Sequence, residues 1–207
     1  MIPAPTLLAF LSASVLLAVT PGPGIMYVLT RSLAGGRREG VLSSLGTFVG
    51  GFAHVLAAGL GISAVLATSA IAYRTVRWAG ALYLVFLGTR MIRSAGLEEQ
   101  THSDEGRRGN PFLQGIVTEV LNPKTALFFL SLIPQFVDAR VGSVLVQFLV
   151  LGTISVFLNT SADLLVAAFA GPIGTRLLSS RQARKRQRRA TGAVMVGLGV
   201  YVAARDA

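Results

Sequence analysis

Four ionisable side chains stand inside long apolar stretches of the chain, where an unpaired charge is costly. Lys124 and Glu119 share one stretch, while Asp163 and His54 are each found in another. Ionisable residues within membrane segments are rare, face protein or a cavity, and mark substrate or proton pathways. If these stretches span a membrane, His54, Glu119 and Asp163 are candidates for proton coupling. Lys124 is then a candidate for binding an anionic group of a substrate.

Two proline motifs interrupt apolar segments at corresponding places, 102 residues apart. The motifs are Thr20-Pro21-Gly22-Pro23-Gly24 and Asn122-Pro123-Lys124. Proline has no N–H and its ring clashes with the carbonyl four residues back, so Pro21 frees the carbonyl of Leu17 and Pro123 that of Glu119. Lipid offers no hydrogen bonds, so these carbonyls must face protein or a water-filled cavity. Paired breaks of this kind indicate a transporter's binding site, although each proline could also be a simple packing kink.

Each break is expected to start a new half-helix at depth in the membrane. Thr20 and Asn122 are suitable N-caps, and Pro21 and Pro123 would then occupy the favoured first helical position. The free N–H groups and the positive end of the helix dipole suit a carboxylate. Lys124 adds a full positive charge beside the second break.

Two helical stripes of small and polar residues complete the candidate site. The first is Gly46, Gly50, His54, Ala57 and Gly61, and the second is Gly152, Ser155, Asn159 and Asp163. Small residues allow helices to approach closely, either within one chain or in a homodimer. On these stripes His54 either carries a proton, contacts substrate or makes a structural hydrogen bond. Asp163 needs a partner such as Lys124, His54, water or a substrate ammonium group, or must itself bind a proton.

The substrate-binding candidates therefore come from both breaks and from the second stripe. They are Pro21, Gly22, Pro23, Asn122, Pro123, Lys124, Asn159 and Asp163.

The composition identifies the elements that must position these residues as membrane helices. The chain has 207 residues, of which 52% are hydrophobic and 14% charged, and no cysteine. A soluble domain is usually about 25% charged, and a disordered chain is less apolar. Without cysteine and with only two histidines, a soft-metal site is not expected. No nucleotide-binding motif is present, so no cofactor is predicted.

The apolar segments predict an all-α, polytopic membrane protein with six transmembrane helices. Four spans are clear and two are shorter: 7–29, 40–73, 78–89, 112–137, 141–175 and 190–204. The polar linker 94–111 separates a first three-helix repeat, 1–93, from a second, 112–207. Because each repeat has an odd number of spans, the two repeats are expected to be inverted, with the first helix of each broken at its proline motif.

The distribution of basic residues predicts the orientation. Of the 19 Lys and Arg residues, 14 fall on the side of the loops after spans one, three and five, 4 fall on the side of the termini, and Lys124 lies within a span. The positive-inside rule then places both termini outside the cytoplasm. The basic run 181–189 is expected to be a cytoplasmic loop facing anionic lipid, rather than a nucleic-acid site. The first span has no basic residue before it and is read as a retained helix, not a signal peptide.

Several motifs resemble those of the LysE/RhtB family of amino-acid exporters. They are Pro21-Gly22-Pro23, the Gly46, Gly50, His54 and Gly61 spacing, Tyr83-Leu84 with Leu87-Gly88 before Arg90 and Arg93, Asn122-Pro123-Lys124 with Phe128-Phe129, and Pro134-Gln135-Phe136. The resemblance covers about the first two thirds of the chain and implies a six-helix fold that exports amino acids. Asn159 and Asp163 match no motif of the family and rest on the helical-face argument alone.

The sequence thus favours an exporter of amino acids or close derivatives in the bacterial cytoplasmic membrane, not an enzyme. Its partners would be the substrate and membrane lipid, and its energy source a proton gradient. A transporter of another solute or ion, an intramembrane enzyme using His54, Glu119 and Asp163, and a structural or signalling membrane protein are the alternatives.

Overall fold

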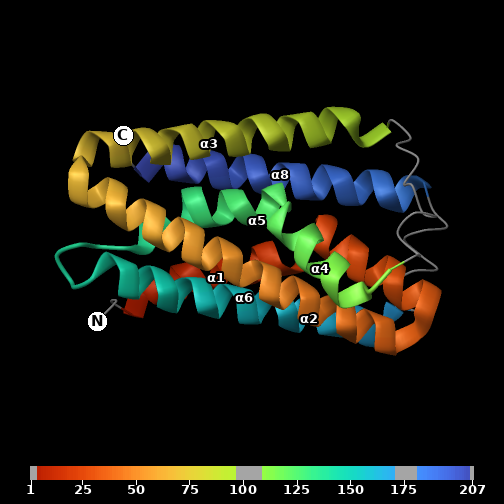
Figure 1. The fold of residues 1–207 in the computed structure, drawn as a ribbon. Helices are drawn as coiled ribbons and strands as arrows, with labels where there is room; N and C mark the ends of the chain where they lie inside the picture. Colours follow the sequence, from red (N-terminus) through yellow and green to blue (C-terminus); the bar gives the residue numbers. More distant parts are fainter. Residues whose placement is uncertain (1–3, 97–108, 171–180, 206–207) are drawn as a thin grey trace.

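The computed structural model describes residues 4–96, 109–170 and 181–205, which form helices joined by short turns and loops and contain no strand. The elements lie roughly along one direction (Figure 1). They are α1 (Ala4–Val19), α2 (Pro23–Thr68), α3 (Ala70–Arg93), η1 (Ser94–Gly96), α4 (Pro111–Val120), α5 (Pro123–Leu127), η3 (Phe128–Leu132), η4 (Ile133–Phe136), α6 (Val144–Ala168) and α8 (Arg181–Arg205).

Both predicted breaks are confirmed, but the first has a different cap from the one expected. α1 ends at Val19 and α2 begins at Pro23, so Pro23 rather than Pro21 takes the first helical position. The backbone carbonyl of Gly22 accepts the first helical hydrogen bond, from the Met26 N–H at 3.0 Å. Thr20 is not the cap: its hydroxyl donates to the carbonyl of Leu16 at 2.6 Å, one turn back in α1.

The second break follows the expectation closely. α4 ends at Val120, and the Asn122 side chain caps α5 by accepting the Lys124 N–H at 3.0 Å. Pro123 is the first residue of α5. The segments before and after the break are bent by 42°, and α5 continues into a short π-helix at Phe128–Leu132.

A sharp turn at Gly36 divides α2 into two helices, 23–35 and 37–68. Gly36 has φ 77° and ψ −174°, a conformation that residues with a Cβ rarely adopt. The first helix completes the segment that α1 began, and the second runs back along the bundle (Figure 1).

The stripe of small residues on α2 packs against α4 of the same chain. A Cβ on Gly50 would lie 2.7 Å from the carbonyl oxygen of Ile116, and one on Gly46 would overlap the carbonyl oxygen of Phe112. Gly115 makes the reciprocal approach, because its Cβ would lie 2.6 Å from the Ser43 carbonyl oxygen. The stripe therefore serves a close contact within one chain, and a homodimer stays a prediction.

α6 packs against α2 and α1 and encloses the main apolar core. Four phenylalanines, each at most 2% exposed, fill it: Phe10, Phe128, Phe129 and Phe148. The small face of α6 is turned inward as predicted, with Gly152 against Phe129 and the hydroxyl of Ser155 3.2 Å from that of Ser14.

α3 and α8 form a second close pair beside this core (Figure 1). A Cβ on either Gly88 or Gly192 would lie 2.5 Å from the carbonyl oxygen of the other. The basic run 181–189, expected to be a loop, is instead the first part of α8. Its Arg, Lys, Gln and Ala residues are all good helix formers, so the apolar helix extends through them.

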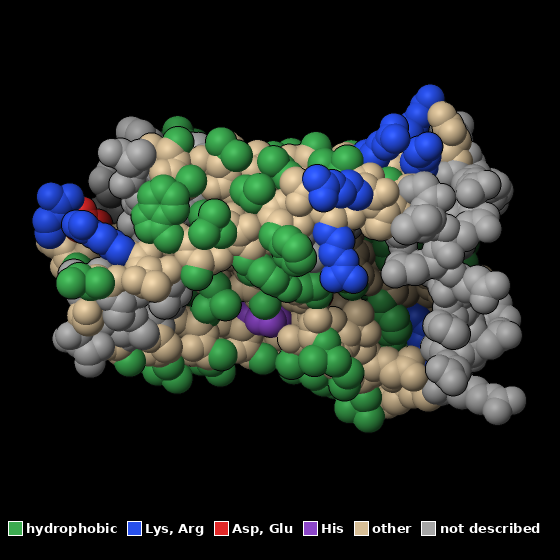
Figure 2. Space-filling view, turned by 90° about the horizontal axis from the view of Figure 1, so that it is seen from above, with side chains coloured by type: hydrophobic (Ala, Val, Ile, Leu, Met, Phe, Trp, Pro, Cys, Tyr) green, Lys and Arg blue, Asp and Glu red, His purple; other side chains and the backbone are tan. Residues whose placement is uncertain are grey.

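The face seen in Figure 2 is largely apolar along the middle of the molecule, with basic side chains towards both ends. The described ends of α1 and α8, near the two chain termini, lie at one end of the bundle, whereas α3 ends and α8 begins at the other (Figure 1). By length and composition, Pro23–Gly61, which includes the turn at Gly36, and Val144–Ala168 each contain a segment that could cross a membrane. The broken pair Pro111–Val120 and Pro123–Phe136 could form a third crossing. These counts cover only the described residues, and the six-span arrangement stays a prediction.

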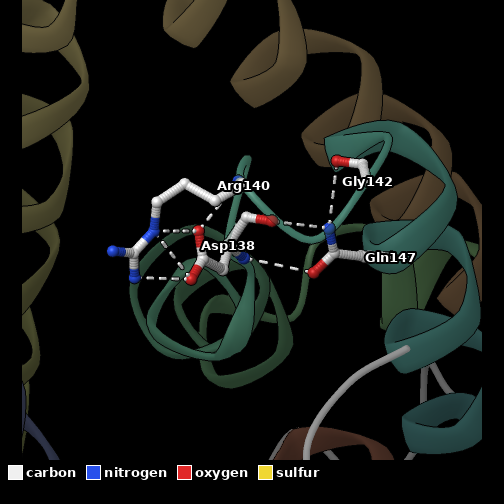
Figure 3. A network of polar contacts seen from close by, with 4 residues as sticks. All are labelled: Asp138, Arg140, Gly142 and Gln147. Atoms are coloured by element: carbon white, nitrogen blue, oxygen red, sulfur yellow. Dashed lines mark hydrogen bonds and ion pairs between the residues drawn. The ribbon is translucent and has the colours of Figure 1, made fainter.

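A compact hydrogen-bonded loop precedes α6 (Figure 3), at the end of the bundle where the termini lie (Figure 1). The side chain of Gln147 accepts from the Asp138 N–H at 3.1 Å and donates to the carbonyls of Asp138 and Gly142 at 2.9 and 3.2 Å. Arg140 lies 2.8 Å from the Asp138 carboxylate. Hydrogen bonds from the side chain and backbone of Arg140 hold the pKa of Asp138 at about 2.

Candidate functional site

A small buried cavity lies where the two breaks meet, between α2, α4, α5 and α6. Thr47 on its wall lies about 16 Å along the helix from the turn at Gly36, at 1.5 Å per residue, so the cavity is well inside the bundle. Its volume of about 20 Å³ leaves room for water but not for an amino acid in this state. The lining residues are Gly24, Ile25, Thr47, Gly51, Glu119, Asn122, Lys124, Thr125, Phe129, Val156, Asn159, Thr160 and Asp163.

Lys124 joins the second break to the first. Its side chain is 4% exposed, and its Nζ donates to the carbonyls of Leu17 at 3.1 Å and Thr20 at 2.9 Å. The expectation that the Leu17 carbonyl is freed from the regular helix pattern is confirmed, and an ammonium group from the other half of the chain is one of its partners. Gly22 allows this approach, because a Cβ there would lie 3.0 Å from Cδ of Lys124.

Glu119 lies at the end of α4, buried to 7% exposure. Its Oε2 accepts from the Asn122 amide at 2.9 Å and its Oε1 from the Thr125 hydroxyl at 2.6 Å. A Cβ on Gly24 would lie 2.7 Å from the same Oε2. The glycine of the first break thus gives space to the carboxylate of the second.

His54 satisfies the carbonyl that Pro123 frees. Its Nε2 lies 2.8 Å from the backbone oxygen of Glu119, which also accepts the Asn122 N–H at 3.0 Å. The ring stacks near Phe129, with centroids 6.0 Å apart, and His54 is not among the residues that line the cavity. His54 therefore makes a structural hydrogen bond, one of the three roles expected for it from the sequence. A proton-carrying role for His54 stays a prediction.

Asp163 faces the cavity from α6 and has a partner that the sequence did not suggest. It is 5% exposed, and its Oδ2 accepts from the Thr47 hydroxyl at 2.8 Å. Among the described residues no ion pair within 4.0 Å joins it to Lys124. Asn159 lies one turn before it and uses its amide nitrogen on the Ser155 carbonyl at 3.0 Å.

The structure brings together the charged and amide candidates but not the prolines. Asn122, Lys124, Asn159, Asp163 and Glu119 line the cavity. Pro21, Gly22, Pro23 and Pro123 do not, and instead form the breaks around it.

Sequence reasoning missed the three threonines of the cavity wall, Thr47, Thr125 and Thr160. Each lies next to a residue that was singled out, Gly46, Lys124 and Asn159. Threonine is common in membrane helices, where its hydroxyl usually bonds to its own helix, as Thr160 does to Val156 at 2.9 Å. Only the packing shows that Thr125 donates to the Glu119 carboxylate. The Thr47 hydroxyl lies 2.9 Å from the Ser44 carbonyl of its own helix and also 2.8 Å from the Asp163 carboxylate.

The site combines one ammonium and two carboxylates in a nearly closed, hydroxyl-rich cavity. Such a set can bind a zwitterion by its two ends. Among the described residues there is no group of three His, Cys, Asp or Glu side chains that could hold a metal ion.

A polar cavity between broken helices of an apolar bundle is typical of a membrane transport protein. The chain belongs to the LysE type translocator family, whose model matches residues 15–206. A Vibrio cholerae protein described as an uncharacterized membrane protein is 31% identical over 97% of each chain. Homoserine/homoserine lactone efflux proteins of Salmonella typhimurium and Salmonella typhi are both 30% identical over 94% of each chain. No solved structure matches the chain.

Proposed function

We propose that this protein exports an amino acid or a close derivative across the bacterial cytoplasmic membrane. The family match and the relatives described as homoserine/homoserine lactone efflux proteins support this class of substrate. The observation that carries the proposal is the buried cavity in which Lys124, Glu119 and Asp163 meet. Buried charges without a full set of charged partners suit a ligand that brings both signs.

The proposed arrangement is six transmembrane helices in two inverted repeats, with both termini outside the cytoplasm. The excess of basic residues on the opposite side supports this orientation. The contact of Lys124 with the first break supports a pseudo-symmetric site formed by both halves.

In this proposal Lys124 binds the substrate carboxylate, and the ammonium group lies between Asp163 and Asn159. Glu119 is the second candidate for the ammonium group, although Asn122 and Thr125 already donate to its two oxygens. Among the residues that the structure describes, Asp163 has one donor, Thr47, on a single oxygen, which leaves its other oxygen for a ligand. Lys124 has three donor hydrogens and uses two on carbonyls.

Entry from the cytoplasm requires the two halves to separate at one end. At that end the Tyr27 hydroxyl donates to the Pro111 carbonyl at 2.7 Å, and Arg31 donates to the Gly109 carbonyl at 2.7 Å. Arg31 also pairs with Glu39 at 3.3 Å. Rocking of the halves about the cavity would break the first two contacts and open a path to the site.

Proton coupling follows if one carboxylate binds either the substrate ammonium or a proton, but not both. Asp163 is our first choice for this group and Glu119 the second. The carboxylate would release the substrate and bind a proton on the outer side, and release the proton and bind substrate on the cytoplasmic side. An inward proton gradient would then drive outward transport.

The test is transport of labelled amino acids by the purified chain in proteoliposomes, with and without a proton gradient. Lys124→Met should abolish uptake, and Lys185→Met is a matched control, because Lys124 and Lys185 are the two lysines of the chain. Asp163→Asn should abolish gradient-driven transport, with Asp138→Asn, at a half-exposed aspartate outside the cavity, as its control. Absence of movement across a broad panel of amino acids and lactones would refute the proposal, and chemical change without net movement would favour the intramembrane enzyme.

A further inference from the structure

A second cleft lies on the outside of the bundle, at the end of α3 and away from the transport cavity. It has a volume of about 310 Å³ and is lined by Phe86, Thr89, Arg90, Arg93 and Ser94. None of these residues takes part in the site described above.

Two arginines supply the cationic part of the cleft. Arg90 and Arg93 are exposed and three residues apart, a spacing that places them on the same face of a helix. Guanidinium groups bind phosphate oxygens through two parallel N–H bonds. Two guanidinium groups on one helix face are therefore suited to binding a phosphate group.

The same helix face becomes apolar towards the middle of the bundle. Phe86 is 57% exposed and lies one turn before Arg90, and Leu82, another turn back, is 66% exposed. The order along the helix is thus apolar first and cationic at the end. A free phosphate ion would use only the arginines, whereas a phospholipid would use the whole face.

Further basic residues lie near this end of α3. α8 packs beside α3 and η1, and its first turns carry Lys185, Arg186 and Arg189. Neither α3 nor α8 contains an acidic residue. Figure 2 shows blue side chains at both ends of a face that is largely apolar in between.

We propose that this cleft binds an anionic phospholipid. Its phosphate would lie between Arg90 and Arg93, and an acyl chain would follow Phe86 and Leu82 towards Trp78. Basic pockets at the membrane surface recognise anionic headgroups in this way. Lipid binding at this cleft is independent of the transported substrate. Lipid binding can therefore be absent while the proposed transport holds, and transport can be absent while lipid binding holds.

Trp78 gives a direct readout, because it is the only tryptophan of the chain and is 38% exposed on α3. It lies about 18 Å along the helix from Arg90 at 1.5 Å per residue, within the length of a lipid chain. The full chain is reconstituted with phosphatidylglycerol and phosphatidylcholine, one of them carrying brominated acyl chains that quench tryptophan. The measurement is the relative binding constant of the two lipids at Trp78.

The wild-type chain should prefer phosphatidylglycerol by about 30-fold, since each basic residue near a membrane surface contributes on the order of a fivefold gain. Arg90→Gln/Arg93→Gln should reduce the preference to within about twofold of parity. Lys185→Gln/Arg186→Gln removes the same charge at the same end but outside the cleft. Arg74→Gln/Arg140→Gln removes two positive charges at the opposite end of the bundle. Both controls should keep most of the preference.

Equal quenching by the two lipids in the wild-type chain would overturn the proposal without any variant. An equal loss of the preference in Lys185→Gln/Arg186→Gln would also overturn it, because the attraction would then come from all basic residues at this end and not from the cleft. Displacement of the lipid by millimolar inorganic phosphate would identify a free-anion site instead. Thermal unfolding checks that each variant folds, and Arg90→Lys/Arg93→Lys, which keeps the charge but loses the guanidinium groups, should retain an intermediate preference.

Discussion

The contact between α2 and α4 at Gly50 sets the position of Glu119, and a single methyl group tests it. In Gly50→Ala the added Cβ would lie 2.7 Å from the Ile116 carbonyl oxygen and 2.9 Å from Cβ of Glu119. Ordinary contact begins at 3.4 Å, so α4 must move by about 0.7 Å, and backbone atoms cannot rotate away as a flexible side chain can. Overpacking of this kind costs about 1–3 kcal/mol, a large part of a typical stability of 5–15 kcal/mol.

The matched control is Gly61→Ala, eleven residues further along the same stripe. Among the described residues, no atom lies within 4 Å of the position its Cβ would take. Replacing glycine by alanine in a helix then stabilises it by up to about 1 kcal/mol.

The assay is chemical unfolding in detergent, followed by transport in proteoliposomes. Gly50→Ala should lower the unfolding free energy by about 1–3 kcal/mol and impair transport, because Glu119 shifts with α4. Gly61→Ala should leave both unchanged or slightly raise stability. If Gly50→Ala unfolds like the wild type but changes the oligomeric state, the stripe serves a dimer and the intrachain reasoning is refuted.

Two further predictions concern single polar contacts. His54→Leu should lower the unfolding free energy by about 1 kcal/mol, the typical net value of one hydrogen bond. His54→Gln keeps a hydrogen-bond donor and should transport normally. Loss of transport in a stably folded His54→Gln would instead indicate that His54 carries a proton. Arg140→Gln should raise the pKa of Asp138 from about 2 towards its ordinary range, as followed by NMR titration of the carboxyl carbon. Because the folded pKa is depressed, the ion pair stabilises the protein above the unfolded pKa of about 4, and this contribution is lost as pH falls through about 2. A pH profile of unfolding that is identical in wild type and Arg140→Gln would contradict this.

Much of the helical plan could be predicted because proline and apolar length act locally. Pro23 and Pro123 each begin a helix, and the break near each appears at the expected residues. The expected cap at Thr20 was wrong because a hydroxyl at a helix end can equally bond backwards within its own helix, and Gly22 was free to take the cap. The basic run 181–189 was expected to be a loop because its charge obscured its helix propensity.

The candidate site was only partly predictable, because partners in a cavity come from distant parts of the chain. Charge alone identified Lys124, Glu119 and Asp163, since each is exceptional in an apolar segment. The partner of Asp163, Thr47, is 116 residues away and carries no unusual chemistry in the sequence. Likewise, nothing in the local sequence of Lys124 shows that its ammonium group binds the Leu17 and Thr20 carbonyls.

The bond from Lys124 to the Thr20 carbonyl also has a consequence for synthesis. The two residues are 104 positions apart, so at about 5–20 residues per second the ribosome needs about 5–20 s to add the lysine after the threonine. During that time the open end of α1 has to keep its carbonyls hydrated or bound by the insertion machinery, because lipid cannot satisfy them. The first half of the chain should therefore settle fully into the bilayer only when the second half arrives.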